Sequence, residues 1–531
     1  MAMTRASKLR ARNYFVRRGN GGPMRWGIAG LGPEIGGLQT GMGQRNTGFQ
    51  FFANQACLAT CGIVGTKLRL RFANGYFPLG IFTPNTNPVN IEGADIVLGS
   101  VFDPVAKTWS GGTIYPIKFD GSTTYTFAAG EERFADDIEA PFTPFSMIRI
   151  RMAGNVAAGD RLPGHRYSLK ALIGEGSNDG GGSQIARLAT PAGTITAGTG
   201  NFSGGGFTAV AAFFNVKTGG VIVLSDSRFK AGEHPSLATD RGAMGFIEKA
   251  YDSPTNGRVP VWLIGAPSSS LSTMRNGGNP GTPCVPWVVN ICAALGQRPF
   301  DNVDVHLGTN DLAGGATEAS FEGHYQGLST TLRSIEPSRA LRITAGTMGP
   351  TTTQDSVSAP GNFGATEAGQ TIWVRATQGP DPSSRSIVNT RLLAGGFAAQ
   401  GIDGVSNVGG VAEGVTKAKV KSTGFVGQLA QAIPTAGNIS VAVLATQATV
   451  GEVLLFEQDD ATNFDVDGSY QILGISGSAG AWSHTLARTV KKIHAAGVSV
   501  KTTNSVDSLH YHGNIHNQQA DVLAATKVAL I

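Results

Sequence analysis

The sequence predicts an α/β domain built on a parallel sheet, preceded by an antiparallel β-sandwich. Continuous apolar runs such as residues 221–224 are typical of buried parallel strands, and helical patterns separate one run from the next. In the N-terminal part, strand-length segments alternate instead with period two, beginning with residues 67–72. At 531 residues the chain is long enough to bury two such cores.

The N-terminal part divides into an arm and the predicted sandwich. Residues 1–30 carry a cluster of Lys and Arg side chains, whereas the remainder of the chain is near charge balance, so we expect a solvated tail or a tether to a larger assembly rather than a nucleic-acid site. Residues 31–217 contain short alternating strands broken by Gly, Pro and Asn, which favour a sandwich. We expect this domain to be a packing module, with glycan binding as the alternative.

Strand and helix patterns alternate through residues 218–531, the predicted α/β domain. Strands are expected at 221–224, 259–265, 303–307, 341–345 and 400–405, and helices at 237–250, 285–295, 321–335 and 386–399. The helix at 285–295 is expected to end at Gly296, because glycine readily adopts the left-handed conformation that closes a helix. This alternation predicts βαβ units around a parallel sheet with helices on both faces.

One stretch of this domain departs from the βαβ pattern. Residues 412–475 contain two apolar runs, 439–444 and 452–456, and are interpreted as an inserted hairpin or small subdomain. A helix is expected to follow at 481–496. The insertion either overhangs the site or is a surface embellishment without contact to substrate.

Three short polar motifs follow or stand beside these strands. They are Ser-Asp-Ser-Arg at 225–228, Gly-Thr-Asn-Asp at 308–311 and Asp-Ser-Leu-His at 507–510. The first two come at the carboxyl ends of strands, where open α/β sheets bind ligands. Each motif alone is explained as a turn or a helix cap. Together, in this order, they supply a hydroxyl, an amide donor and a carboxylate beside an imidazole, which favours serine-esterase chemistry.

This order of motifs resembles that of the SGNH (GDSL-like) hydrolases, over residues 220–531. The resemblance implies a three-layer α/β/α fold with Ser227 as nucleophile, His510 as general base and Asp507 as the acid that orients it. It implies Asn310 and the backbone N–H of Ser227 as oxyanion donors. Residues 65–137 look like the jelly-roll domain that precedes the catalytic domain in some bacterial SGNH esterases.

Two positions depart from the family pattern. Ser225 stands where the family usually has a glycine in its first block. The family's second-block glycine, a further oxyanion donor, has no clean match in residues 261–268; Gly265 is the candidate, and the backbone N–H of Ser268 could serve instead.

The predicted activity is hydrolysis of an ester through an acyl-enzyme, with no cofactor. An O-acetyl group on a carbohydrate is favoured over a long-chain lipid, because the sequence contains no large apolar lid. No metal site is expected, since the C-terminal histidines lack carboxylate or thiol partners and the four cysteines do not form a zinc pattern.

The expected partner is an acetylated glycan or another small ester, with neither nucleic acid nor a membrane, and a homo-oligomer or a virion assembly stays open. The sequence shows no signal peptide or transmembrane segment, which leaves a virion-associated or a cytoplasmic location. A phage-borne polysaccharide deacetylase would fit the first location. The competing class is a non-catalytic virion or adhesion protein that keeps the hydrolase scaffold, for which Ser225 and the unclear second block are the hints.

Overall fold

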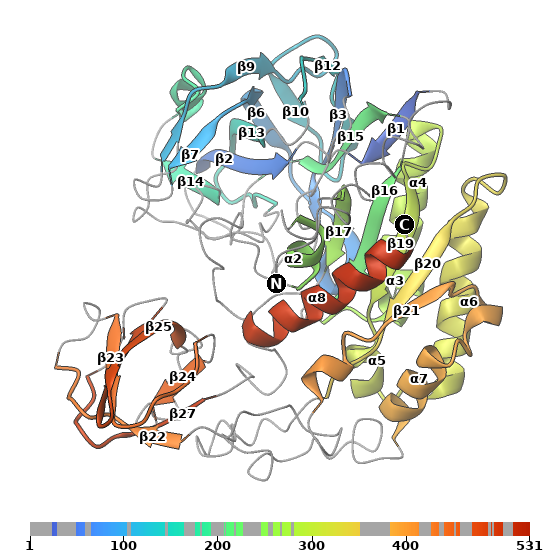
Figure 1. Cartoon of the computed structure of the whole chain (residues 1–531). Helices are drawn as coiled ribbons and strands as arrows, with labels where there is room; N and C mark the ends of the chain where they lie inside the picture. The colour runs from blue at the N-terminus through green and yellow to red at the C-terminus, as the bar shows by residue number, and fades with distance from the viewer. Residues whose placement is uncertain are drawn as a thin grey trace.

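The fold is described from a computed structural model (Figure 1). The described residues are 24–28, 49–58, 65–103, 108–143, 147–163, 176–180, 183–192, 207, 209–216, 219–226, 246–252, 259–265, 268–277, 281–350, 383–413, 426–434, 440–450, 453–456, 470–486, 490, 493–502 and 513–530.

The N-terminal part contains two antiparallel sheets packed on one another. The first has the order β1-β15-β3-β11, with β12 also on β3: β1 Arg25–Ile28, β15 Ala209–Val216, β3 Lys67–Ala73, β11 Glu132–Phe134 and β12 Ile138–Glu139. The second has the order β10-β6-β13-β2-β14, with β9 also on β6: β10 Tyr125–Phe127, β6 Val89–Leu98, β13 Met147–Val156, β2 Phe49–Leu58, β14 Gly176–Gly180 and β9 Thr113–Pro116.

The alternation predicted for residues 67–72 is confirmed in β3. Leu68, Leu70 and Phe72 are fully buried and share one core with Ile148 and Ile150 of β13, whereas the intervening Lys and Arg side chains are half-buried. Period-two burial of this kind makes one face of each sheet apolar, so that the two sheets pack face to face. Residues 25–28, which lie within the expected arm, form β1 on the first sheet.

Smaller elements extend this part. The hairpin β7 Val101–Asp103 and β8 Thr108–Ser110 stands by itself, and the 3₁₀ turns are η1 Pro78–Gly80 and η3 Ile185–Leu188. A three-stranded sheet joins β4 Gly75–Tyr76 and β5 Ile81–Pro84 to β18 Thr282–Pro283, far along the chain.

A parallel sheet forms the centre of the predicted α/β domain. Its order is β17-β16-β19-β20-β21: β17 Val261–Gly265, β16 Gly220–Ser225, β19 Phe300–His306, β20 Arg342–Gly346 and β21 Gly404–Ser406. All residues of β16 and β17 are buried, which explains why both are continuous apolar runs rather than alternating ones.

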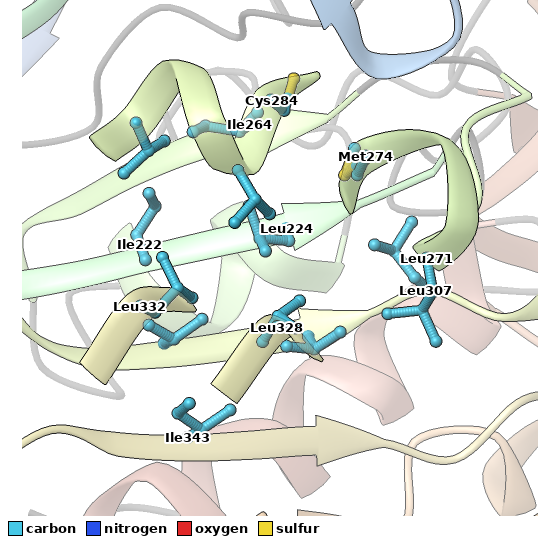
Figure 2. Packing of buried hydrophobic residues seen from close by; sticks show 14 of the residues in the cluster. Ile222, Leu224, Ile264, Leu271, Met274, Cys284, Leu307, Leu328, Leu332 and Ile343 are labelled. Atoms are coloured by element: carbon cyan, nitrogen blue, oxygen red, sulfur yellow. The ribbon is translucent and has the colours of Figure 1, made fainter. Parts of the chain in front are cut away.

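Helices cover both faces of the parallel sheet. One face packs on α3 Leu271–Asn276, α4 Cys284–Leu295, α6 Glu318–Ser334 and α7 Ser384–Leu393, and the other on α2 Phe246–Asp252 and α8 Gly513–Leu530. Figure 2 shows Ile222 and Leu224 of β16 among side chains from the first group of helices. The short elements around the sheet are α5 Thr309–Ala313, η9 Ala398–Gln400 and η10 Gly410–Ala412.

The predicted strands and helices of this sheet agree with the structure to within a few residues at most ends. The helix predicted at 285–295 is α4, and Gly296 closes it in the left-handed conformation with φ 71°. The predicted edge strand at 400–405 is shorter and forms β21 at the edge of the sheet. Of the helix predicted at 237–250, residues 237–245 lie outside the described residues, and 246–250 belong to α2.

An antiparallel sheet lies between β21 and α8 along the chain (Figure 1, orange). Its order is β22-β27-β24-β25-β26-β23: β22 Val426–Gln428, β27 Ser499–Thr502, β24 Val453–Phe456, β25 Tyr470–Ser478, β26 Ala481–Leu486 and β23 Val441–Leu444. It has a core of its own, which includes Leu454, Phe456 and Ile472. The two apolar runs within 412–475 are β23 and β24, which do not pair with each other, and the sheet continues beyond residue 475 to Thr502.

The predicted helix at 481–496 is wrong. Residues 481–486 form β26, which pairs with β25 across a tight turn at Gly480, where φ is +87°. Buried His484 and Leu486 flank an exposed residue, which is the period of a strand, and their partners come from β25 and β23. Pairing with β23 and β25 therefore overrides the local preference of this alanine-containing segment.

Candidate functional site

The carboxyl ends of the central strands meet at one edge of the parallel sheet. Ser225 ends β16 and lies in register with Gly265, the last residue of β17, and with His306, the last residue of β19. The first motif and the candidate second-block glycine therefore come to the same edge, as the strand pattern predicts. The third strand, β19, leads directly into Gly308 and helix α5.

The turn at residue 308, between β19 and α5, accepts only glycine. The φ of Gly308 is +126°, and a Cβ there would lie 2.4 Å from Met348 Sδ and 2.9 Å from a ring carbon of Phe321. Glycine alone avoids both the backbone strain and the clash. The turn places Asn310 in the first turn of α5, above the end of β19.

Asn310 and Asp311 hold the loop that follows β17. Asn310 Nδ2 donates to the backbone carbonyl of Ser269 at 2.8 Å. The Asp311 carboxylate accepts from the backbone N–H groups of Leu271 at 2.9 Å and Ser272 at 3.2 Å, which begin α3. Burial raises the pKa of Asp311 above its usual 3.8, although these two N–H groups act in the opposite direction. The Gly-Thr-Asn-Asp motif thus fixes the loop that follows β17 against the end of β19.

Ser225 is tied to its neighbours through its hydroxyl. Its Oγ donates to the carbonyl oxygen of His306 at 3.3 Å, and its own carbonyl accepts from Ser269 Oγ at 3.2 Å. The side chain is buried. A serine in this position therefore crosslinks the ends of β16 and β19, and its hydroxyl is turned toward the sheet. Ser268, the alternative second-block donor, has a positive φ of 60°.

A buried polar network lies under this edge, on the side covered by α2 and α8. Asp304 Oδ2 lies 2.9 Å from His306 Nε2 and accepts from the Tyr251 hydroxyl at 2.8 Å, while Asp304 Oδ1 accepts from Thr344 Oγ1 at 2.8 Å. The ring edge of Phe246 packs against the His306 ring, with centroids 5.0 Å apart. Side chains from β19, β20 and α2 thus converge on one carboxylate.

The network sets the charge states of its members. Burial acts to raise the pKa of Asp304, but the charge of His306 and the three hydrogen bonds outweigh it, so this pKa is lower than usual. Burial, reinforced by the neighbouring Asp304 carboxylate, raises the pKa of Tyr251 well above its usual value. Asp304 is therefore an ionised acceptor, and Tyr251 and His306 Nε2 act as donors to it.

A small pocket opens beside this network. Its volume is about 40 Å³, and its lining comes from β16, β19, β20, α2, α8 and the segments after the strands. The lining residues are Ser225, Asp226, Phe246, His306, Leu307, Thr309, Gly346, Thr347, Met348, Gly349, Val408 and Gln519. Ser225 and Asp226 of the first motif, the end of β19 and helix α8 therefore share one cavity.

The structure thus describes some of the sequence-predicted site residues. Asn310 and Gly265 are described, and both belong to the carboxyl edge of the sheet. Ser227, Asp507 and His510 lie outside the described residues. Their chain neighbours are described: Asp226 lines the pocket, and α8 begins at Gly513, shortly after the third motif.

Sequence reasoning missed the network under the edge. The strand predicted at 303–307 contains Asp304 and His306, and two polar residues at alternate positions of a buried strand share one face and indicate a paired polar site. The roles of Tyr251, Thr344 and Gln519 left no signal in the local sequence. Across the described part of the chain, no cluster of His, Cys, Asp and Glu could hold a metal ion. Within that same part, no helix is both long enough and apolar enough to cross a membrane.

Comparison with known proteins gives weak likenesses. No protein-family model matches the sequence, and no curated protein matches it. A carbohydrate esterase family 2 enzyme with a carbohydrate-binding domain from Corynascus thermopiles (Myceliophthora fergusii) shares 13% identity over 62% of this chain and 79% of its own, with a TM-score of 0.19. The acetyl xylan esterase Est2A from Butyrivibrio proteoclasticus shares 12% over 61% and 79%, with a TM-score of 0.19.

A peptidoglycan O-acetylesterase shares 10% identity over 75% of this chain and 78% of its own, with a TM-score of 0.23. TM-scores near 0.2 lie below the range in which a common fold is established. Likenesses of this size carry no conclusion about the function of this chain.

Proposed function

We propose that the chain is a serine esterase of the SGNH type, with Ser227 as nucleophile, His510 as general base and Asp507 as the acid that orients it. One observation carries the proposal. The amide of Asn310, a potential oxyanion donor, is fixed at the same sheet edge as Asp226, the residue before Ser227. Asp226, which directly precedes the proposed nucleophile in the chain, lines the pocket.

The proposed reaction follows from these roles. Ser227 Oγ forms a bond to the ester carbonyl carbon while His510 takes the hydroxyl proton, and Asp507 stabilises the resulting imidazolium. Collapse of the tetrahedral intermediate breaks the bond to the alcohol oxygen, which leaves with the proton from His510. A water molecule, deprotonated by His510, then releases the acid from Ser227 by the same steps.

Asn310 is suited to the oxyanion role. A side-chain amide carries two N–H donors, and one of them is engaged by the Ser269 carbonyl. This bond orients the amide and leaves the second N–H for a developing oxyanion. The proposal adds the backbone N–H groups of Ser227 and Gly265 as further donors.

The proposed substrate is an O-acetyl group on a carbohydrate. The sequence contains no large apolar lid that would cover a long acyl chain. The three-layer SGNH arrangement for residues 218–531 and a jelly-roll identity for the preceding sheets belong to this proposal, as does a phage-borne enzyme that trims host polysaccharide. Helices on both faces of a parallel sheet support the first of these, and two stacked antiparallel sheets support the second.

Hydrolysis of p-nitrophenyl acetate by the purified chain tests the proposal, with Ser227→Ala as the matched control. We expect turnover by the wild-type chain and covalent labelling of Ser227 by a fluorophosphonate probe. If the wild-type chain and the Ser227→Ala variant are equally inactive toward acetyl esters, the esterase proposal fails, and a binding protein that keeps the scaffold takes its place.

A further inference from the structure

Two buried polar atoms that line the same pocket have no hydrogen-bond partner within the described part of the chain. They are His306 Nδ1 and Gln519 Oε1. The side chain of His306 is 4% exposed, and Gln519 as a whole is 4% exposed, so bulk water does not solvate either group. Buried polar atoms are nearly always hydrogen-bonded, which makes two of them in one pocket informative.

A partner for these two atoms must suit one ring nitrogen and one amide oxygen. The Asp304 carboxylate is an acceptor only, so His306 Nε2 carries the hydrogen between them, and Nδ1 is left with a lone pair on the neutral ring or an N–H on the charged ring. Gln519 Nε2 donates to the carbonyl oxygen of Val408 at 3.1 Å, which identifies the other atom of this amide as the oxygen. A ligand that links both groups must therefore donate to the amide oxygen and either donate to or accept from the ring.

The size of the pocket indicates which ligand can bind between these two atoms. A water molecule needs roughly 10–15 Å³ of such volume and two to four polar partners. The pocket has about 40 Å³ and also includes Ser225, Asp226 and Thr347 in its lining. Water fits this space and can both donate and accept hydrogen bonds.

We propose that ordered water binds in this pocket, links His306 to Gln519, and thereby positions α8 against the carboxyl edge of the sheet. The inference rests on the proposed function, because α8 begins shortly after Asp507 and His510. The position of α8 then determines where the base enters the site. His306 and Gln519 are positioning residues in this view, since they act through the water and the helix.

Two substitutions of His306 separate the pocket from the network beneath it. In His306→Asn the side-chain amide reaches as far as Nδ1 and still contacts the pocket, but the hydrogen bond to the Asp304 carboxylate is lost. In His306→Gln the amide reaches as far as Nε2 and keeps that hydrogen bond, but it no longer contacts the pocket. Gln519→Met removes the acceptor, and with it the donor to the Val408 carbonyl, at nearly constant length. Thr526→Val, which loses a hydrogen bond to Val522 within α8, is the matched control on the same helix.

We expect His306→Gln and Gln519→Met to lower kcat for p-nitrophenyl acetate about tenfold or more, because small misplacements of catalytic groups are costly. His306→Asn should keep kcat within about threefold of wild type despite a lower Tm, and Thr526→Val should leave kcat unchanged. If kcat instead follows Tm across the variants, or if His306→Gln turns over like wild type, the positioning role is refuted.

A high-resolution crystal structure of the full chain tests the pocket without reference to activity. We expect ordered density within hydrogen-bond distance of His306 Nδ1 and Gln519 Oε1, and loss of that density in Gln519→Met. Density with no such contact, or none in the pocket, overturns the inference. A wild-type chain without ester turnover would refute the proposed function, while the density would still decide whether the pocket binds water.

Discussion

Asn310→Ala is the substitution that tests the candidate site most directly. It removes the amide that donates to the Ser269 carbonyl at 2.8 Å and, in the proposed mechanism, also binds the oxyanion. These two losses differ in size. A neutral hydrogen bond contributes about 1 kcal/mol to the free energy of unfolding. An oxyanion donor contributes about 2.7–4 kcal/mol to the transition state, which corresponds to a loss of ~10²–10³ in kcat.

The assay compares steady-state hydrolysis of p-nitrophenyl acetate with thermal unfolding of the same preparation. We expect kcat to fall by on the order of 10² and KM to change little, because the donor matters mainly once charge develops on the carbonyl oxygen. Thr317→Ala is the control, since Thr317 caps α6 and its loss costs about 1 kcal/mol of stability at an exposed position.

Two results would count against the reasoning. If Asn310→Ala and Thr317→Ala lower kcat equally, the effect of Asn310 is one of stability. If KM rises while kcat holds, Asn310 positions the substrate in the ground state and does not stabilise an oxyanion.

The other predictions concern the nucleophile, the buried network and the contact between α4 and strand β11 of the first N-terminal sheet. Ser227→Ala should lower ester turnover by ~10³ or more with an unchanged circular dichroism spectrum, and retained turnover would exclude Ser227. Tyr251→Phe should lower the free energy of unfolding by about 1.5–3 kcal/mol in urea titrations, because it removes a donor to a buried carboxylate. The pKa of Asp304 is lower in the folded chain than its usual 3.8, so its contribution to stability is present above that pH and is lost as pH falls below it; Asp304→Asn should flatten this part of the Tm profile. Trp287→Phe removes the indole donor to Glu132 at 2.7 Å and should lower Tm at pH 7, whereas an unchanged Tm would show that water replaces the indole.

The elements that the sequence predicts well are those determined by local rules. An unbroken apolar run indicates a strand buried on both faces, as in residues 221–224 of β16. Gly296 ends α4 because its left-handed conformation is intrinsic to glycine. Asn310 lies in α5 directly after β19, and Gly308 and the strand before it are both readable from sequence.

The features that the sequence does not predict depend on partners outside the segment itself. Residues 481–486 contain no strong strand signal, and they become β26 because β23 and β25 pair with them on both sides. The buried network has the same origin. Tyr251 and Thr344 reach Asp304 from α2 and β20, and these contacts join residues 53 and 40 positions apart. Period-two patterns and caps carry no information about such contacts.

The N-terminal sheets also take part in supporting the site. Phe77 and Phe82 belong to the same core as Trp287 of α4, and β5 pairs with β18 immediately before that helix. Closer to the site, a Cβ on Gly80 would lie 2.8 Å from Met274 Cγ and 3.3 Å from Ser269 Cβ.

The turn at Gly80, where φ is +79°, therefore packs directly on α3 and on the residue whose carbonyl accepts from Asn310. Asp311 fixes the other end of the same short segment by capping α3. The loop that follows β17 is thus held between the turn at Gly80 and the Gly-Thr-Asn-Asp motif at 308–311. The geometry of the proposed oxyanion site therefore depends on both parts of the chain. A packing role for the N-terminal sheets follows from these contacts without any requirement that they bind a glycan.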